Sequence, residues 1–244
     1  MSLLLNGDCL EEMKHLDDDS VDLIFCDLPY GQTSCKWDTC IDLDEFWKQV
    51  MRVKKLKAPI FMTTTTKFGA SLIATAPKKC PFRYDLVWVK SAPVGFLSAK
   101  KMPMKKHEMI YVFYEKLPFY DLSSHKHKFI KEGQGFEDST HKTIYGKQDI
   151  PICKERKNGE SRYDPPLPTT MLEIKSTRGK HSTEKPVALM EWIFKHYRKE
   201  GDVILDPTMG SGSTGVACKH MNRNFIGIEK DPEIYQVAVN RIED

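Results

Sequence analysis

One segment near the start of the chain places an acid, a proline and an aromatic residue directly after an apolar run. Residues 21–30 read VDLIFCDLPY. The apolar run predicts a buried strand, and Pro29 fixes its own φ while it biases Leu28 toward extended backbone. A stiff corner therefore follows the strand, at the edge where open α/β sheets bind ligands. Asp27, the Leu28 carbonyl and the Tyr30 ring suit an amino group on a flat ring, because they offer two acceptors and a stacking surface.

The same ten residues also allow a purely structural interpretation. Asp27 could cap the turn that follows the strand, and Tyr30 could pack inward.

A second segment near the end of the chain is typical of a nucleoside-binding site. Residues 202–215 read DVILDPTMGSGSTG, and residues 224–229 read NFIGIE. The pattern predicts a strand, a glycine-rich turn, a helix and a second strand with a terminal acid. Glycines let a ligand approach the backbone closely, and Glu229 could accept both hydrogen bonds of a ribose diol.

The glycine spacing leaves a dinucleotide site open as an alternative. Gly210, Gly212 and Gly215 match the fingerprint of NAD-binding proteins, so an NAD-dependent oxidoreductase has to be weighed. That fingerprint places its first glycine directly after the strand, whereas Asp-Pro-Thr-Met intervenes here at 206–209. No phosphate-binding lysine follows the glycines, which excludes the P-loop pattern.

The elements that must position these segments form an α/β pattern. Short apolar runs alternate with helical periodicity, which favours a doubly wound, mostly parallel sheet covered on both faces. The predicted strands are Leu3–Leu5, Val21–Cys26, Pro59–Thr63, Leu86–Val89, Met109–Tyr114, Val203–Leu205 and Asn224–Ile228. The predicted helices are Leu10–His15, Leu43–Lys54, Phe68–Ala74, Pro186–Tyr197, Ser213–His220 and Pro232–Ile242.

Charge is unevenly distributed along the 244 residues. The net charge is +3, but residues 1–50 carry 3 basic and 12 acidic side chains, while residues 51–99 carry 9 and 1. A basic middle suggests a face that meets a polyanion. The basic pairs that we expect to neutralise phosphates are Lys54-Lys55, Lys78-Lys79, Lys100-Lys101, Lys105-Lys106 and Arg156-Lys157.

Composition limits the compartment and the metal chemistry. The 7 cysteines form no Cys-x-x-Cys pair, which favours reduced thiols and argues against a disulfide framework or a cysteine-built zinc site. No residue cluster has metal-site spacing, so we expect no metal. No apolar run approaches the ~18 residues of a membrane span, and no secretory leader is apparent. We therefore expect a cytoplasmic protein without a membrane partner.

The stretch from Leu117 to Lys180 differs from the rest of the chain. It is polar and rich in glycine and proline, and it shows no clear period. A structureless loop of that length is unusual in a compact domain, so we predict an inserted functional segment. A second Asp-Pro-Pro at 164–166 lies within it; no apolar strand precedes it, so we interpret it as a loop. Trp88, outside this stretch, is expected to belong to the core.

Four motifs together resemble the S-adenosylmethionine-dependent amino-methyltransferases of DNA. Residues 27–30 resemble the Asp-Pro-Pro-Tyr catalytic signature of that family, and 206–212 resemble its Asp-Pro-Phe-x-Gly-Ser-Gly cofactor loop. His181 to Pro186 and Asn6 to Cys9 supply two further matches. The motif order is similar to the β-class permutation, which implies a Rossmann-like fold with an inserted basic target-recognition region. The implied organisation is one domain, 1–244, with a catalytic half (1–116), a target-recognition segment (117–180) and a cofactor half (181–244).

The resemblance implies roles on the substrate side of the site. Asp27 and the Leu28 carbonyl would accept hydrogens from the target amine, Pro29 would stiffen the corner, and Tyr30 would stack on a base extruded from double-stranded DNA. Leu28 replaces the usual first proline, which is tolerable because a backbone carbonyl acts there. Aspartate at 27 is the family's common choice for adenine, whereas cytosine-amino enzymes often carry serine. Adenine is therefore favoured and cytosine stays an alternative.

The resemblance also implies a site for S-adenosylmethionine. Asp8 would bind the adenine amine of the cofactor with the Cys9 backbone nearby, and Glu229 would hold its ribose. The methionine pocket would be shaped by Asp206, Pro207, Gly210 and Gly212. The cofactor's carboxylate would lie near Thr183, Lys185, Ser213 and Thr214. Thr208-Met209 replaces the usual phenylalanine-containing pair.

Three further alternatives stay open at this point. A non-catalytic DNA-binding subunit could keep the fold without turnover. Methylation of a protein glutamine uses a similar signature, but that family normally places the cofactor loop first. A homodimer is an open partner alternative, beside double-stranded DNA.

Overall fold

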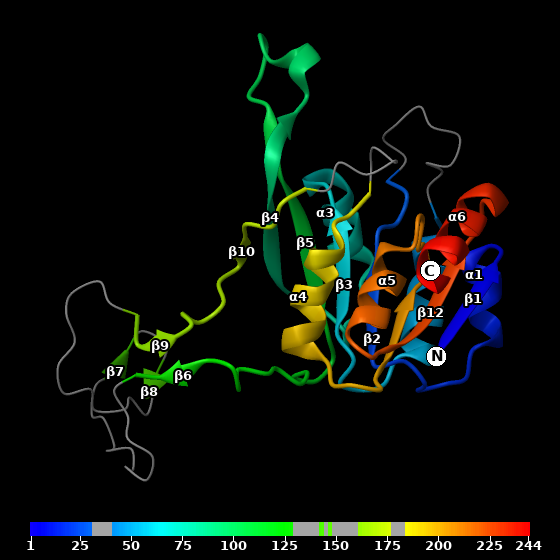
Figure 1. Ribbon diagram of the computed structural model, residues 1–244, viewed down its shortest axis with the longest axis horizontal. Helices are drawn as coiled ribbons and strands as arrows, with labels where there is room; N and C mark the ends of the chain where they lie inside the picture. Colours follow the sequence, from blue (N-terminus) through cyan, green and yellow to red (C-terminus); the bar gives the residue numbers. More distant parts are fainter. Residues whose placement is uncertain (31–40, 129–141, 144–145, 148–160, 177–183) are drawn as a thin grey trace. The chain divides into compact units, whose positions relative to one another are not determined.

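The computed structural model describes residues 1–30, 41–128, 142–143, 146–147, 161–176 and 184–244. The chain divides into two compact units. The first unit comprises residues 1–120 and 170–244, and the second comprises residues 121–169. Figure 1 shows the elements of both units along the chain.

The first unit is built on an eight-stranded sheet with the order β1-β12-β11-β2-β3-β5-β4-β10. Strand β5 pairs antiparallel with β3 and with β4, and the other neighbouring pairs are parallel. The bounds are β1 Ser2–Asn6, β2 Leu23–Cys26, β3 Ile60–Thr64, β4 Phe82–Val94, β5 Lys105–Phe113, β10 Met171–Leu172, β11 Val203–Asp206 and β12 Asn224–Glu229. The predicted mostly parallel α/β architecture is confirmed.

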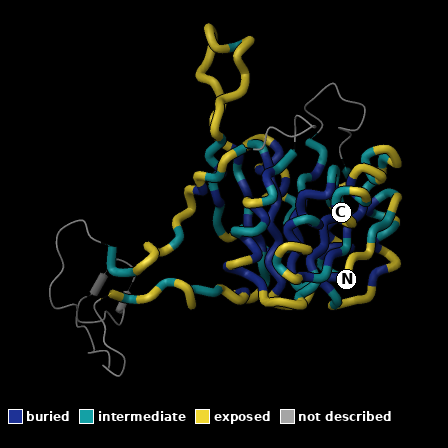
Figure 2. Tube along the Cα trace, viewed as in Figure 1, coloured by how far each residue is buried: buried dark blue, intermediate teal, exposed yellow. Residues whose placement is uncertain are grey.

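Helices cover both faces of this sheet. Their bounds are α1 Cys9–Glu12, α2 Leu43–Val53, α3 Thr66–Thr75, α4 Val187–Tyr197, α5 Ser213–His220 and α6 Pro232–Glu243, with short 3₁₀ turns at Met13–His15 and Phe96–Ser98. Apolar side chains of α1, α2 and α3 pack into one core layer, and those of α4, α5 and α6 pack into the other. Figure 2 shows buried backbone concentrated in the sheet between these layers.

Strand periodicity decides which layer each residue joins. Leu23 and Phe25 of β2 face the layer under α4 and α5, whereas Ile24 and Cys26 face the layer under α2. Successive side chains of a strand point to opposite faces. Because both faces are buried, the strand reads as a continuous apolar run.

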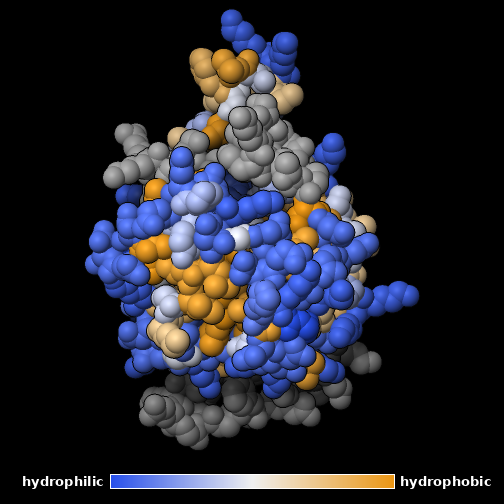
Figure 3. Space-filling view, turned by 90° about the vertical axis from the view of Figure 1, so that its right-hand side faces the viewer, coloured by the Kyte–Doolittle hydropathy of each residue, from blue (hydrophilic) through white to orange (hydrophobic). Residues whose placement is uncertain are grey.

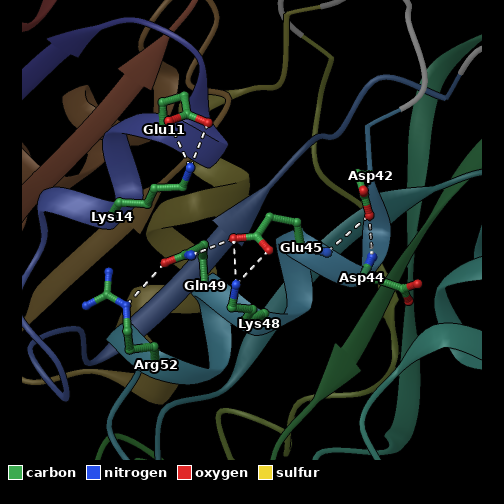
Figure 4. Close-up of polar contacts among 8 residues, drawn as sticks. All are labelled: Glu11, Lys14, Asp42, Asp44, Glu45, Lys48, Gln49 and Arg52. Carbon is green, nitrogen blue, oxygen red and sulfur yellow. Dashed lines mark hydrogen bonds and ion pairs between the residues drawn. The ribbon is translucent and has the colours of Figure 1, made fainter.

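Helix α2 is fixed by polar contacts at both of its ends, and Figure 4 shows the capping contacts of its first turn. Asp42 caps its first turn, where the carboxylate accepts from the backbone nitrogens of Asp44 at 3.0 Å and Glu45 at 3.1 Å. In the last turn, Arg52 donates to the carbonyls of Met13 at 2.6 Å and Leu16 at 2.7 Å. The helix is thereby tied to the segment that follows α1.

The predicted elements are all present, and the largest errors concern β4 and β5. Strand β4 runs to Val94 and β5 begins at Lys105, so both extend well beyond the predicted Leu86–Val89 and Met109–Tyr114. Residues 91–94 of β4 and 105–107 of β5 are exposed and carry no apolar alternation, which is why the sequence pattern missed them. Trp88 belongs to the core as predicted: it is 3% exposed, and its indole donates to the carbonyl of Ile174 at 2.8 Å.

In the second unit, two short antiparallel pairs join β6 (Lys126–His127) to β9 (Tyr163–Asp164) and β7 (Lys142–Thr143) to β8 (Gly146–Lys147). The interpretation of the second Asp-Pro-Pro as a loop is therefore wrong for Asp164, which belongs to β9. Asp164 is part of a strand because its backbone pairs with β6. The ring of Tyr163 also contacts the ring of His127 edge-on, with 4.9 Å between the ring centroids.

Two observations concern compartment and thiols. Cys9, Cys26, Cys80 and Cys218 are free and buried, while the other cysteines lie outside the described residues. No helix in the described ranges combines the length and the apolar character that a membrane span requires.

Candidate functional site

Three acids meet at one edge of the sheet. Strands β2, β11 and β12 are neighbours in the sheet and run parallel, so their carboxyl ends share an edge. Asp206 ends β11, Glu229 ends β12, and Asp27 directly follows β2. The negative charges of Asp27 and Glu229 both raise the pKa of Asp206. The catalytic and cofactor motifs predicted from sequence therefore belong to one site.

The carboxylate of Asp27 is held from several sides. Its Oδ1 accepts a hydrogen bond from the Tyr30 hydroxyl at 2.7 Å and another from the Thr63 hydroxyl of β3. Its Oδ2 lies 2.5 Å from the Lys185 ammonium. Burial raises the pKa of Asp27, but the charge and hydrogen bonds of these partners outweigh burial, and the net pKa lies below the ordinary value. Asp27 is therefore ionised at neutral pH.

Lys185 connects Asp27 to a row of alternating charges. Its ammonium also lies 3.0 Å from Oε1 of Glu108 on β5, and Oε2 of Glu108 lies 2.7 Å from the ammonium of Lys90 on β4. Burial lowers the pKa of Lys185, but Asp27 and Glu108 raise it above its ordinary value. The side chains of Lys185 and Glu108 are 12% and 11% exposed. Each charge therefore offsets the cost of removing the other from water.

Sequence analysis missed Glu108 and Lys90. The available signal was an acid within the run KKHEMIYVF, where an unpaired charge would be costly to bury.

The residues after Asp27 form the expected corner. Leu28 is buried in the core layer of α2, and Pro29 is half-buried. The Tyr30 ring lies 5.3 Å from the ring of Phe68 in a tilted arrangement. Burial and the charge of Asp27 raise the pKa of Tyr30 above its ordinary value, so its hydroxyl remains a hydrogen-bond donor.

Asp206 is a buried carboxylate at the start of the glycine-rich turn. It accepts from the Thr208 backbone nitrogen at 3.1 Å and from the Thr214 hydroxyl at 2.5 Å. Within the described part of the chain, no cationic side chain forms an ion pair with it. Burial raises the pKa of Asp206 to about 7, with the hydrogen bonds from Thr214 and Thr208 opposing the rise.

The two glycines predicted for the cofactor loop have different surroundings. Gly210 has φ +51°, and a Cβ placed there would meet no atom of the described residues within 4 Å. Gly212 has φ +82°, but a Cβ there would approach Ala238 and Ile242 of α6 at 3.1 and 3.0 Å. Gly210 therefore faces open space, whereas Gly212 allows the turn to pack on α6.

Glu229 is set beneath this turn. Its Oε2 accepts from the Gly210 backbone nitrogen at 3.0 Å, and its Oε1 accepts from the Asp231 backbone nitrogen at 2.9 Å. Burial raises the pKa of Glu229, and these hydrogen bonds oppose the rise. Each oxygen keeps a further lone pair for a ligand.

Asp8 reaches the same edge through the pairing of β1 with β12. Asn6 pairs with Glu229, and the Gly7 backbone nitrogen donates to the Glu229 carbonyl at 3.0 Å. Asp8 caps α1 through the Leu10 backbone nitrogen at 3.0 Å, and its other oxygen lies 3.0 Å from the Lys230 ammonium.

The remaining predicted cofactor residues have these positions. Cys9 is buried next to Asp8, and burial raises the pKa of its thiol to about 12. Pro207 is buried within the turn. The Ser213 hydroxyl accepts from Arg241 at 3.2 Å, and the same guanidinium pairs with Glu184 at 2.6 Å. Thr183 lies outside the described residues.

The expectation that Lys54-Lys55 neutralise phosphates is wrong. Lys54 is 1% exposed and pairs with Glu115 at 2.7 Å. Lys55 pairs with Asp22 at 2.9 Å, at the amino end of β2. Both lysines therefore lie away from the site and already have partners.

The site contains groups that a nucleoside cofactor with an ammonium would complete. The buried carboxylate of Asp206 lacks a cation, the space beside Gly210 is open, and the buried Thr208 hydroxyl has no hydrogen-bond partner among the described residues. The described residues contain no group of three or more histidines, cysteines or acids that could hold a metal ion.

A family model described as DNA methylase (N6_N4_Mtase) matches residues 21–240. The chain belongs to the DNA methylase family. This membership confirms the predicted family of amino-methyltransferases of DNA that use S-adenosylmethionine as cofactor. It excludes the NAD-dependent oxidoreductase that the glycine spacing had left open.

Two curated relatives of this DNA methylase are Type II methyltransferases by name. The Type II methyltransferase M.HinfI of Haemophilus influenzae is 28% identical over 271 aligned residues, which cover 100% of this chain and 69% of that protein. The Type II methyltransferase M2.DpnII of Streptococcus pneumoniae is 40% identical over 92 residues, which cover 38% of this chain and 34% of that protein.

Solved structures of other methyltransferases share the fold of this DNA methylase. The M1.HpyAVI–SAM complex matches with a TM-score of 0.67 and 23% identity, over 100% of both chains. The cytosine-N4-specific PvuII DNA methyltransferase matches with a TM-score of 0.68 and 14% identity, over 100% of this chain and 86% of that one. At these identities the likeness supports the fold alone, and it confirms the predicted class.

Proposed function

We propose that this DNA methylase transfers a methyl group from S-adenosylmethionine to the exocyclic amine of adenine, on a base flipped out of double-stranded DNA. The observation that carries the proposal is the ionised carboxylate of Asp27, held on Oδ2 by Lys185 and on Oδ1 by the hydroxyls of Tyr30 and Thr63. An acid at this position, in place of the serine that cytosine enzymes of the family often carry, favours adenine.

The chemical difficulty lies in the target amine. Its lone pair is delocalised into the ring, so the amine is a poor nucleophile. S-adenosylmethionine supplies a methyl group on a strongly electrophilic sulfonium. The protein's task is therefore to align the amine and to stabilise the positive charge that develops on it.

Asp27 and the Leu28 carbonyl perform this task as two hydrogen-bond acceptors. When the Tyr30 ring stacks on the base, its hydroxyl leaves Oδ1. That oxygen keeps the hydrogen bond from Thr63 and gains a free lone pair for the amine. Lys185 stays on Oδ2 and keeps the carboxylate ionised and oriented. The lowered pKa of Asp27 suits an acceptor that stabilises charge rather than a strong base. Transfer is then direct and needs no covalent enzyme intermediate.

Different residues bind different parts of S-adenosylmethionine. Asp206 would pair with the methionine ammonium, since no cationic side chain among the described residues pairs with its buried carboxylate. Glu229 accepts from the ribose hydroxyls with the lone pairs left after Gly210 and Asp231. Asp8 accepts from the adenine amine. Gly210 leaves room for the ligand against the turn.

Target recognition belongs to the compact unit 121–169. Flipping a base costs a few kcal/mol, which stacking on Tyr30 partly offsets. Reading the sequence around the base requires side chains that reach the grooves, and this second unit is the inserted part of the chain. Phosphate contacts by exposed lysines predict an affinity that falls steeply with salt.

Two variants separate catalysis from cofactor binding. Asp27→Ala should abolish transfer of tritiated methyl groups to DNA, while its dissociation constant for S-adenosylmethionine, measured by calorimetry, stays within about twofold of wild type. Glu229→Gln should instead weaken cofactor binding. Asp17→Ala, at an exposed acid far from the site, is the control that should change neither measurement. Equal loss of cofactor affinity in the Asp27 and Glu229 variants would refute the assignment.

A further inference from the structure

Strands β4 and β5 continue beyond the sheet as an exposed hairpin, residues 91–107, which we call the β4–β5 hairpin. Phe96 is 81% exposed, Leu97 is 99% exposed and Met102 is 61% exposed. Four exposed lysines flank them, and the segment contains no acid; the lysines are Lys100, Lys101, Lys105 and Lys106. Figure 2 shows the hairpin exposed along its length, and Figure 3 shows hydrophobic and hydrophilic surface side by side at its end.

The hairpin leaves the sheet at the edge that carries the site. Strand β4 is parallel to β3 and β2, because β4 and β3 both pair antiparallel with β5. Its carboxyl end at Val94 therefore lies at the same edge as the carboxyl end of β2, which Asp27 follows. By the same argument, Lys78 and Lys79, which precede β4, lie at the opposite edge, so the expectation that this pair neutralises phosphates does not hold for DNA bound at the site.

The base of the hairpin is linked to the catalytic carboxylate. Lys90 pairs with Glu108 at 2.7 Å, Glu108 pairs with Lys185 at 3.0 Å, and Lys185 pairs with Asp27. Ser91 and Ser176 exchange backbone-to-hydroxyl hydrogen bonds at 3.2 and 3.0 Å. These contacts hold the start of the hairpin in a fixed relation to Asp27.

Large apolar side chains exposed together on a projecting tip indicate a partner. Lysines without acids select a polyanion. A flipped base leaves a gap in the stack of its helix, whose walls are the apolar faces of the neighbouring bases. Proteins that distort DNA insert apolar wedges between base steps, and phenylalanine and leucine are among the residues used. The tip therefore combines the two features that duplex DNA with one base removed from the stack would bind.

We propose that the β4–β5 hairpin enters double-stranded DNA beside the target base. Phe96 and Leu97 occupy the space that the base vacates, and the lysines of the hairpin contact the flanking phosphates. The inference rests on the proposed function and extends it, because it names the element that holds the flipped state open.

We call Phe96 and Leu97 the wedge. Their role is tested with a variant of both residues and with a DNA substrate whose target base is already unpaired. The variant is Phe96→Ala/Leu97→Ala, and Leu117→Ala, 76% exposed beyond the end of β5 at the opposite edge, is the matched control. The target sequence is first read from modified bases in DNA of cells that express the chain. Methylation is then compared on that duplex and on a duplex with an abasic site opposite the target base, where pairing no longer retains the base.

The wedge variant should methylate the paired duplex at least about tenfold more slowly, and the abasic duplex within about threefold of wild type. When 2-aminopurine replaces the target base, wild type should raise its fluorescence and the wedge variant should not. Cofactor binding should match wild type, which shows that the variant is folded. Full transfer on the paired duplex, or equal loss on both substrates, would overturn the inference. Absence of transfer by wild type would instead refute the proposed function.

The phosphate contacts are tested by salt dependence. Each lost phosphate contact lowers the slope of log affinity against log salt by about 0.9. Lys100→Gln/Lys101→Gln should therefore lower the slope by about 1.8, while Lys78→Gln/Lys79→Gln, a lysine pair at the opposite edge, should leave it unchanged. Equal slopes for both pairs would contradict the contacts.

Sedimentation distinguishes DNA from a second copy of the chain as the occupant. A dimer that the wedge variant dissociates, with unchanged methylation of the paired duplex, would show that the tip binds a second copy and would overturn the inference.

Discussion

Cofactor binding should depend on pH through Asp206. Burial raises the pKa of this carboxyl to about 7, and it must ionise to pair with the methionine ammonium. At pH 6 only about one-tenth of the carboxyl is ionised, so the affinity for S-adenosylmethionine should be about tenfold lower than its limiting value, or about 1.4 kcal/mol. Above pH ~8 the cofactor amine loses its proton, because free α-amino groups titrate near 7.7–8.0. The affinity should therefore peak between these two values.

The assay is calorimetric titration of wild type and Asp206→Asn with S-adenosylmethionine from pH 5.5 to 8.5. The asparagine keeps the size of the side chain and removes its titration. At pH 7.5 the variant should bind about ten- to hundredfold more weakly, since hydrogen bonds to charged groups contribute about 1.5–3 kcal/mol. The affinity of this variant for S-adenosylmethionine should not fall as the pH drops below 7.

The result that would refute this reasoning is an acid limb of equal steepness in both proteins. It would assign the proton to another group, such as Glu229, and would leave Asp206 with the structural role of tying the glycine-rich turn to Thr214.

Three further predictions follow from the same geometry. The pKa of Asp206 is raised from 3.8 to about 7 in the folded state, so the cofactor-free protein should lose stability as pH rises between these values. The loss relative to Asp206→Asn should be at most on the order of 4 kcal/mol in urea unfolding. Lys185→Met should move the acid limb of kcat/KM to higher pH, because the pKa of Asp27 loses its main lowering charge; an unchanged limb with full activity would contradict the role of Lys185. Gly210→Ala should weaken cofactor binding and lower Tm modestly, because a φ of +51° is unfavourable for alanine. Gly212→Ala should lower Tm more, because its Cβ would also crowd α6; the larger fall in Tm for Gly210→Ala would show that the two glycines are misassigned.

Much of the first unit could be predicted because its signals are local. The buried strands are short apolar runs, and Asp42 and Asp231 precede their helices as capping residues. Three of the four motifs lie at strand ends, and the parallel topology brings Asp27, Asp206 and Glu229 to one edge. The strand order therefore explains why residues far apart in the sequence share this edge.

What the sequence did not reveal depends on contacts between distant segments. The ion pairs of Lys185 with Asp27 and Glu108 join three separate parts of the chain, and no spacing rule connects them. From the sequence, Lys54 was expected to be a surface charge beside Lys55. It is buried because it pairs with Glu115, which follows the end of β5 and is far from it in the sequence. The β4–β5 hairpin was missed because exposed strands lack the apolar alternation that a core imposes.

Nucleoside mass spectrometry tests the central claim most directly. DNA is incubated with the purified chain and S-adenosylmethionine that carries a labelled methyl group, digested to nucleosides and separated. We predict labelled N6-methyladenine with wild type and none with Asp27→Ala. Labelled N4-methylcytosine with wild type would contradict the choice of adenine, and equal labelling by both proteins would contradict the catalytic role of Asp27.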